Sequence, residues 1–208
     1  MSKWVGAVAV VGLLAMGVGC TSTADAQRRA AEQKRTYLLE ADTSAVAARA
    51  ARFDAVKVRA FRSLPPFNTA SLVVRRGNGE TVLDFYTAWV AAPHELARVQ
   101  VTRYLERVGL FRAVYDASSG ALPPLGLEGT VCELFLDCRG AVPEAVVTLR
   151  LVVLDERATE FTVVGAAERT ARVGCDAARE DGIAVAFNAA LTQALGAVVE
   201  ALGVEEGK

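Results

Sequence analysis

The segment "SLVVRRGNGETVLDFY", residues 71 to 86, places the strongest local restriction on how this chain can fold. Two runs rich in β-branched and aromatic residues flank Gly77, Asn78 and Gly79. Glycine and asparagine tolerate the positive φ angles of a tight turn, so this order of residues is a strong signal for a β-hairpin. The segment therefore predicts two strands joined by a turn, and the fold must contain a sheet.

Alternating apolar and polar residues predict further strands along the chain. In residues 146–154 the apolar side chains at odd-numbered positions share one face, whereas Thr148 and Arg150 point the other way. In "VKVRAF" the alternation places Val56, Val58 and Ala60 on one face and Phe61 on the opposite face. Besides the hairpin, strands are expected in "RTYLLEAD", in 56–61, near 111–115, and in 127–137, 146–154 and 160–167.

Two segments change to the helical period of 3.6 residues. The first follows Pro93, a residue favoured at helix starts, and ends near Gly109, where a C-terminal cap belongs. The second covers Ile183 to Leu202 and is closed by Gly203. The apolar stripes consist of Ala97, Val101, Tyr104, Leu105 and Val108 in the first helix and of Phe187, Leu191, Ala194, Leu195, Val198 and Leu202 in the second.

Two substantial helices and several strands predict the α+β class. We expect a mixed or antiparallel sheet with two main helices in a single domain that covers residues 35–208. The chain has 208 residues, which is long enough for one continuous core but leaves little room for a second large domain.

The N-terminal residues are typical of a secretory signal. Lys3 precedes an apolar run that is too short to span a bilayer and that ends in "GVGC" at Cys20. Small residues before a cysteine resemble the lipobox of bacterial lipoproteins, although Gly17 stands where Leu is usual. We therefore interpret residues 1–19 as a lipoprotein signal peptide and 20–34 as a polar tether lipidated at Cys20. Cleavage after Ala26, in an A-x-A site, and an uncleaved N-terminal anchor are the alternatives.

Composition and motifs exclude several function classes. The 23 basic and 24 acidic residues nearly cancel, which argues against a nucleic-acid partner. Neither the phosphate loop GxxxxGK[ST] nor the nucleophile motif GxSxG occurs. His94 is the only histidine, and the sequence offers no suitable carboxylate cluster beside it. We therefore expect no catalytic residues, no metal site and no cofactor, and hence no enzyme activity.

Three cysteines remain if Cys20 carries lipid. In one extended strand Cys132 and Cys138 would lie about 20 Å apart, too far for a disulfide. Cys138 and Cys175 both lie in turn-like segments of a chain expected in an oxidising compartment. They are the preferred disulfide pair, with Cys132 as a buried thiol.

The order of these segments resembles the ABC-type transport auxiliary lipoproteins, the PqiC-like family. Members have a Y-x-L strand after the lipidated cysteine, a V-x-V strand, an L-P segment and a V-x-R hairpin. A Tyr, a Trp and a Pro then lead into the first long helix. Here these features fall on Tyr37 and Leu39, Val56 and Val58, Leu64 and Pro65, Val73 and Arg75, and Tyr86, Trp89 and Pro93.

The resemblance implies a periplasm-facing accessory subunit of an ABC/MCE-type transporter that takes part in lipid transport between the inner and outer membranes. The implied partners are an MCE-type periplasmic protein and the ABC permease and ATPase complex. Residues 35–208 would form the ABC-transport auxiliary domain, which could also form a homo-oligomer. Thr21 and Ser22 give no Asp-type inner-membrane retention signal, so we expect an anchor in the outer membrane. The alternative function is a structural or pilot-like assembly lipoprotein of the outer membrane.

Three residues near the hairpin are candidates for partner contacts. Arg75 and Arg76 flank the turn, where charged residues are usually solvated. Trp89 lies between the hairpin and the first helix, where a tryptophan is more often part of the core than of a binding site.

Overall fold

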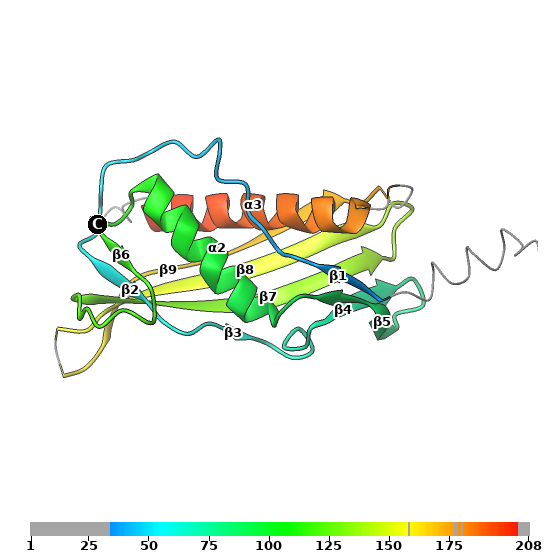
Figure 1. Ribbon diagram of the computed structural model, residues 1–208, viewed down its shortest axis with the longest axis horizontal. Coiled ribbons are helices and arrows are strands. Elements are labelled where there is room, and N and C mark those ends of the chain that lie inside the picture. The colour runs from blue at the N-terminus through cyan, green and yellow to red at the C-terminus, as the bar shows by residue number, and fades with distance from the viewer. Residues whose placement is uncertain (1–33, 158, 177–178, 180, 204–208) are drawn as a thin grey trace, which may run out of the picture. The chain divides into compact units, whose positions relative to one another are not determined.

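The computed structural model describes residues 34–157, 159–176, 179 and 181–203. The predicted signal peptide, Cys20 and the tether up to residue 33 lie outside these residues. Within the described part, nine strands form one mixed sheet and two helices complete an α+β fold, as predicted. Both helices lie on the same side of the sheet (Figure 1).

The predicted hairpin is formed by β4 (Ser71–Arg76) and β5 (Thr81–Trp89), which pair antiparallel. Gly79 has a φ of 83°, in the left-handed region that glycine occupies without strain. The N–H of Gly79 donates to the carbonyl of Arg76 at 3.0 Å. The turn chemistry of the sequence therefore fixes the hairpin as expected. β1 (Arg35–Tyr37) extends this side of the sheet by pairing parallel with the end of β5.

The central strand is β7 (Leu125–Cys138), which is paired along both sides. Three successive segments of the earlier chain lie parallel to it: β2 (Val56–Val58), β3 (Arg62–Ser63) and β4. β6 (Val114–Tyr115) pairs with the outer side of β2. The chain from 56 to 76 therefore borders β7 in three short steps rather than as one strand.

On its other side β7 pairs antiparallel with β8 (Glu144–Asp155), and β8 pairs with the edge strand β9 (Thr162–Gly174). The predicted alternation in β8 is confirmed. Its odd-numbered apolar side chains are buried, whereas Arg150 on the opposite face is exposed. β9 extends beyond the predicted end at Ala167. The prediction stopped short because exposed charged residues such as Arg169 and Arg172 interrupt the apolar pattern there.

Both predicted helices are present: α2 (Pro93–Val108), which has Pro93 in its first turn, and α3 (Gly182–Gly203). Gly109 caps α2 with a φ of 72°, and its N–H donates to the carbonyl of Leu105. The predicted stripes of both helices are buried. α3 packs on β8 and β9, and α2 packs over β7. By length and composition α3 could cross a membrane, but half of its most apolar window is buried inside the domain.

The predicted alternation in "VKVRAF" is wrong at its end. Val56 and Val58 are buried as expected, but Ala60 is exposed and Phe61 is buried. β2 stops at Val58, so the period of two does not continue to Phe61. The ring of Phe61 packs over Gly129, where a side chain on β7 would otherwise stand.

Candidate functional site

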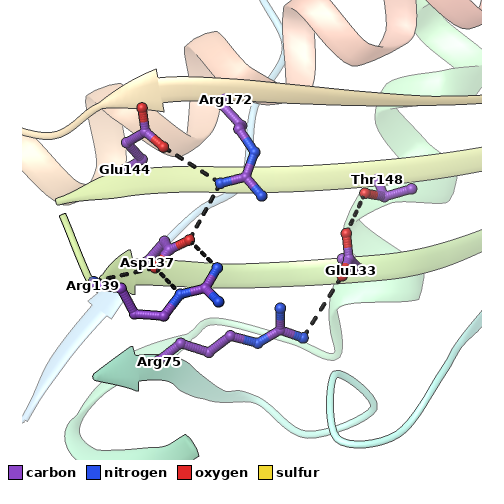
Figure 2. Close-up of polar contacts among 7 residues, drawn as sticks. All are labelled: Arg75, Glu133, Asp137, Arg139, Glu144, Thr148 and Arg172. Atoms are coloured by element: carbon purple, nitrogen blue, oxygen red, sulfur yellow. Dashed lines mark hydrogen bonds and ion pairs between the residues drawn. The ribbon is translucent and has the colours of Figure 1, made fainter. Parts of the chain in front are cut away.

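The face of the sheet opposite the helices carries a cluster of polar side chains near one end of β7 (Figure 2). We call it the polar cluster. It draws residues from β4, β7, β8 and β9, together with the residue that follows β7. Its members are Arg75, Glu133, Asp137, Arg139, Glu144, Thr148 and Arg172.

Asp137 is the centre of this cluster. Its side chain is buried, and it accepts two hydrogen bonds from the guanidinium of Arg139, at 2.7 and 2.6 Å. The guanidinium of Arg172 donates to the same carboxylate at 3.2 Å and lies 3.4 Å from Glu144. The hydrogen bonds from Arg139 hold the pKa of Asp137 well below its ordinary value, and the bond from Arg172 acts in the same direction against the opposing effect of burial.

A second set of contacts surrounds Glu133. Arg75 lies 3.7 Å from one oxygen of Glu133, and its guanidinium stands over the ring of Phe135 at 3.8 Å from the centroid. The hydroxyl of Thr148 donates to the other oxygen of Glu133 at 2.8 Å, and it also lies 2.8 Å from the hydroxyl of Thr170. One chain of contacts therefore runs from β4 to β9 across four strands.

Register explains why these residues meet. Arg75 pairs with Asp137, and Asp137 pairs with Glu144, so the three stand side by side on neighbouring strands. A β-bulge at Cys132 changes the register of β7 between Val131 and Glu133. This shift places Glu133 opposite Thr148 on the face away from the helices.

The chemistry of the polar cluster favours binding or structural support. Each of its charged side chains already has an oppositely charged neighbour, so none is poised as a free acid or base. Within the part of the chain that the structure describes, no three His, Cys, Asp or Glu side chains are grouped so that they could hold a metal ion. The arrangement is a network of paired charges, of which the arginines remain partly exposed.

The candidate contact residues of the sequence separate into three environments. Arg75 belongs to the polar cluster. Arg76 is exposed and lies 3.6 Å from Glu80 across the turn. Trp89 is only 3% exposed and meets the ring of Phe187 edge to face at 5.0 Å between centroids. Trp89 is therefore a core residue and is not available as a surface contact.

The preferred disulfide is not formed in this structure, where Cys132, Cys138 and Cys175 are free thiols. Cys138 ends β7, and Cys175 follows β9 with its N–H bonded to the carbonyl of Pro143. β8 lies between β7 and β9 in the sheet. Burial raises the pKa of both thiols, and the Cys138 thiol adds to the raised pKa of Cys175. Cys132 is partly exposed at the bulge rather than buried as expected.

The polar cluster was missed by the analysis of the sequence, apart from Arg75. The sequence carries no clear signal for it, because the residue between Glu133 and Asp137 on the same face of the strand is the apolar Phe135. Their partners could not be named, because the pairing of β7 with β4 and the bulge at Cys132 have no local signature.

Replacing Asp137 with Asn should weaken the fold in a pH-dependent way. The pKa of Asp137 is lowered, so its ionised form stabilises the folded state above the ordinary pKa of about 4, and this contribution is lost as the pH falls below that value. We expect Asp137→Asn to cost about 1 kcal/mol at pH 7. The difference from the wild type should shrink between pH 5 and pH 3 in urea titrations. A difference that stays constant with pH would contradict the assigned pKa direction.

Comparisons with known proteins show what shares this fold. No family model matches the chain, and no curated protein matches it in sequence. A crystal structure of a Xanthomonas campestris protein of family DUF330 superposes with a TM-score of 0.62 and 19% identity, over 77% of this chain and 90% of that one. The crystal structure of an uncharacterised protein superposes with a TM-score of 0.61 and 10% identity, over 81% of this chain and 98% of that one. The structure of a hypothetical protein from Chlamydia trachomatis superposes with a TM-score of 0.51 and 8% identity, over 73% of this chain and 96% of that one. The chain therefore shares its fold with the DUF330 protein from Xanthomonas.

Proposed function

We propose that this chain is a lipid-anchored accessory subunit of an ABC/MCE-type transporter, facing the periplasm and taking part in lipid movement between the two membranes. The observation that carries the proposal is the fold match, which spans 90% of the DUF330 protein. The lipobox-like "GVGC" and the polar segment after Cys20 supply the expected anchor, in the outer membrane.

In this proposal the chain binds partners and performs no chemistry of its own. The polar cluster is the candidate docking surface. Asp137 orients the guanidinium groups of Arg139 and Arg172, which remain about half exposed and can donate further hydrogen bonds to a partner. Ion pairs at a surface of this kind give specificity more than affinity. An MCE-type protein or the transporter permease is the proposed partner.

Affinity purification of the full chain from membranes after mild crosslinking should recover an MCE-type protein or its permease. We expect Arg172→Ala to reduce this recovery several-fold, because it removes a donor from the polar cluster. Arg157→Ala is the matched control: Arg157 is also exposed and paired with an aspartate, Asp155, but it lies outside the polar cluster. Circular dichroism checks that both variants fold.

Two outcomes would contradict the proposal. Recovery of a secretin or another pore-forming protein would favour the pilot-like alternative. Equal loss of the partner in both arginine variants would show that the polar cluster is not the docking surface.

A further inference from the structure

Strand β5 contains a conspicuous irregularity near its middle. Leu72 pairs with Asp84, but the preceding residue, Ser71, pairs with Ala88, so residues 85–87 are extra on the β5 side. The carboxylate of Asp84 accepts the N–H of Tyr86 at 2.9 Å and so stabilises the turn within this bulge. The chain thereby carries Phe85 and Tyr86 out of the regular ladder.

The bulge presents large apolar side chains to solvent. Phe85 is 78% exposed, and Leu83, two residues earlier, is 53% exposed. The rings of Phe85 and Tyr86 meet edge to face at 5.3 Å. We call Leu83, Phe85 and Tyr86 the aromatic bulge. Single exposed apolar residues are common, but two aromatic rings in contact beside an exposed leucine form a surface that the packing of the domain does not require.

The aromatic bulge lies beside the point where the N-terminal segment enters the domain. Arg35 of β1 pairs with Thr87, which is two residues from Phe85. Thirteen residues, 21–33, separate Cys20 from Lys34, the first described residue. A segment of this length spans at most about 45 Å at full extension. A lipid on Cys20 would therefore keep the aromatic bulge close to the bilayer surface.

The side chains suit the interface of a bilayer. Tyrosine is enriched at the headgroup level, where its ring is buried and its hydroxyl stays wet, while phenylalanine and leucine reach the acyl chains. Lys34 and Arg35 lie at the start of β1, are both exposed, and carry the charge that phosphate headgroups attract. A bilayer is therefore a better match for this surface than a protein groove. The segment that carries Cys20 enters the domain beside the aromatic bulge, so a lipid on Cys20 would bring the bilayer to this side of the domain.

We infer that the aromatic bulge inserts into the bilayer to which Cys20 anchors the chain, so that the domain is held at a fixed orientation on the membrane. This inference rests on the lipid anchor of the proposed function. Three side chains bind a membrane weakly by themselves. The tether raises their effective concentration at the surface, so the second contact forms without a large loss of freedom.

The test uses the full lipidated protein in vesicles of phosphatidylethanolamine and phosphatidylglycerol, with no transporter protein present. Phe85→Trp places a fluorescent reporter in the aromatic bulge. Leu122→Trp is the matched control, because Leu122 is 92% exposed and precedes Leu125 at the start of β7, whereas β4 pairs with the end of β7. Leu125 is ten residues from Phe135, which pairs with Val73 of β4, and ten residues of a strand span about 33 Å. The wild-type protein gives the background from the buried Trp89.

We expect the emission of Phe85→Trp to shift to shorter wavelength and to be strongly quenched by lipids with brominated acyl chains, while Leu122→Trp is unaffected. Absence of quenching at Phe85→Trp, or equal quenching in both variants, would overturn the inference. So would a response of Phe85→Trp that occurs only when transporter proteins are added, since the surface would then be a protein interface.

Mass spectrometry of the N-terminal peptide, made before reconstitution, separates this failure from a failure of the anchor. A lipidated Cys20 at the mature N-terminus, together with unquenched Phe85→Trp, rejects the membrane contact and leaves the proposed function intact. A mature chain that begins at Gln27 rejects the anchor and the membrane contact together.

Discussion

Truncation of Trp89 to alanine is expected to cost about 3 to 5 kcal/mol of unfolding free energy, the usual range for removing a buried tryptophan. Trp89 ends β5, and its ring packs against Phe187 of α3. The contact joins the hairpin side of the sheet to the helix that covers β8 and β9. Loss of the ring would leave a cavity that neither element can close, since each is held in place by its own hydrogen bonds. Urea denaturation followed by circular dichroism measures the effect.

Phe85→Ala is the control for this experiment, because it removes an aromatic ring from the same strand. Phe85 is exposed, so its truncation should change stability by no more than about 0.5 kcal/mol. The comparison separates the burial of a ring from its location on β5. Similar losses in both variants would show that Trp89 is not the core residue described above.

Replacing Gly129 with alanine should cost about 1 to 3 kcal/mol, although alanine is the smallest possible addition. A Cβ atom at this position would lie 2.2 Å from two ring atoms of Phe61. The ring is buried, so it must be pushed out of the core or the strands must separate. Gly77→Ala is the control, since a Cβ there has no atom within 4 Å in the described structure. Thermal and urea unfolding of both variants would measure the difference.

A double-mutant cycle tests the cause. In a Phe61→Ala background the clash no longer exists, so Gly129→Ala should become nearly neutral there. The two substitutions would then cost less together than the sum of their separate effects. Strict additivity would indicate that Gly129 is required for a reason other than the ring of Phe61.

Local signals predicted the elements whose structure depends on neighbouring residues. The Gly77-Asn78-Gly79 turn, the cap at Gly109 and the apolar stripe of α3 were each evident in a few consecutive residues. Propensity and periodicity act at this range, so the fold class could be derived from them.

Features set by distant pairing were not predictable in this way. The burial of Phe61 depends on a glycine in β7, and the polar cluster depends on the register between β4 and β7 and on the bulge at Cys132. The positions of Cys138 and Cys175, which are free thiols in this structure, are likewise set by the pairing of β7, β8 and β9. Which strands become neighbours is a property of the whole sheet, and a single sequence gives no direct signal for it.

The position of β7 between the early and late strands has a consequence for the order of folding. β7, β8, β9 and α3 are consecutive in the chain and contact one another, so they can assemble as a local unit. β2, β3 and β4 lie parallel to β7 and find their partner only after much of the chain has been made. A chain made from its N-terminus therefore leaves the edges that pair with β7 unsatisfied until β7 has been synthesised, and during that time these edges can pair with other chains.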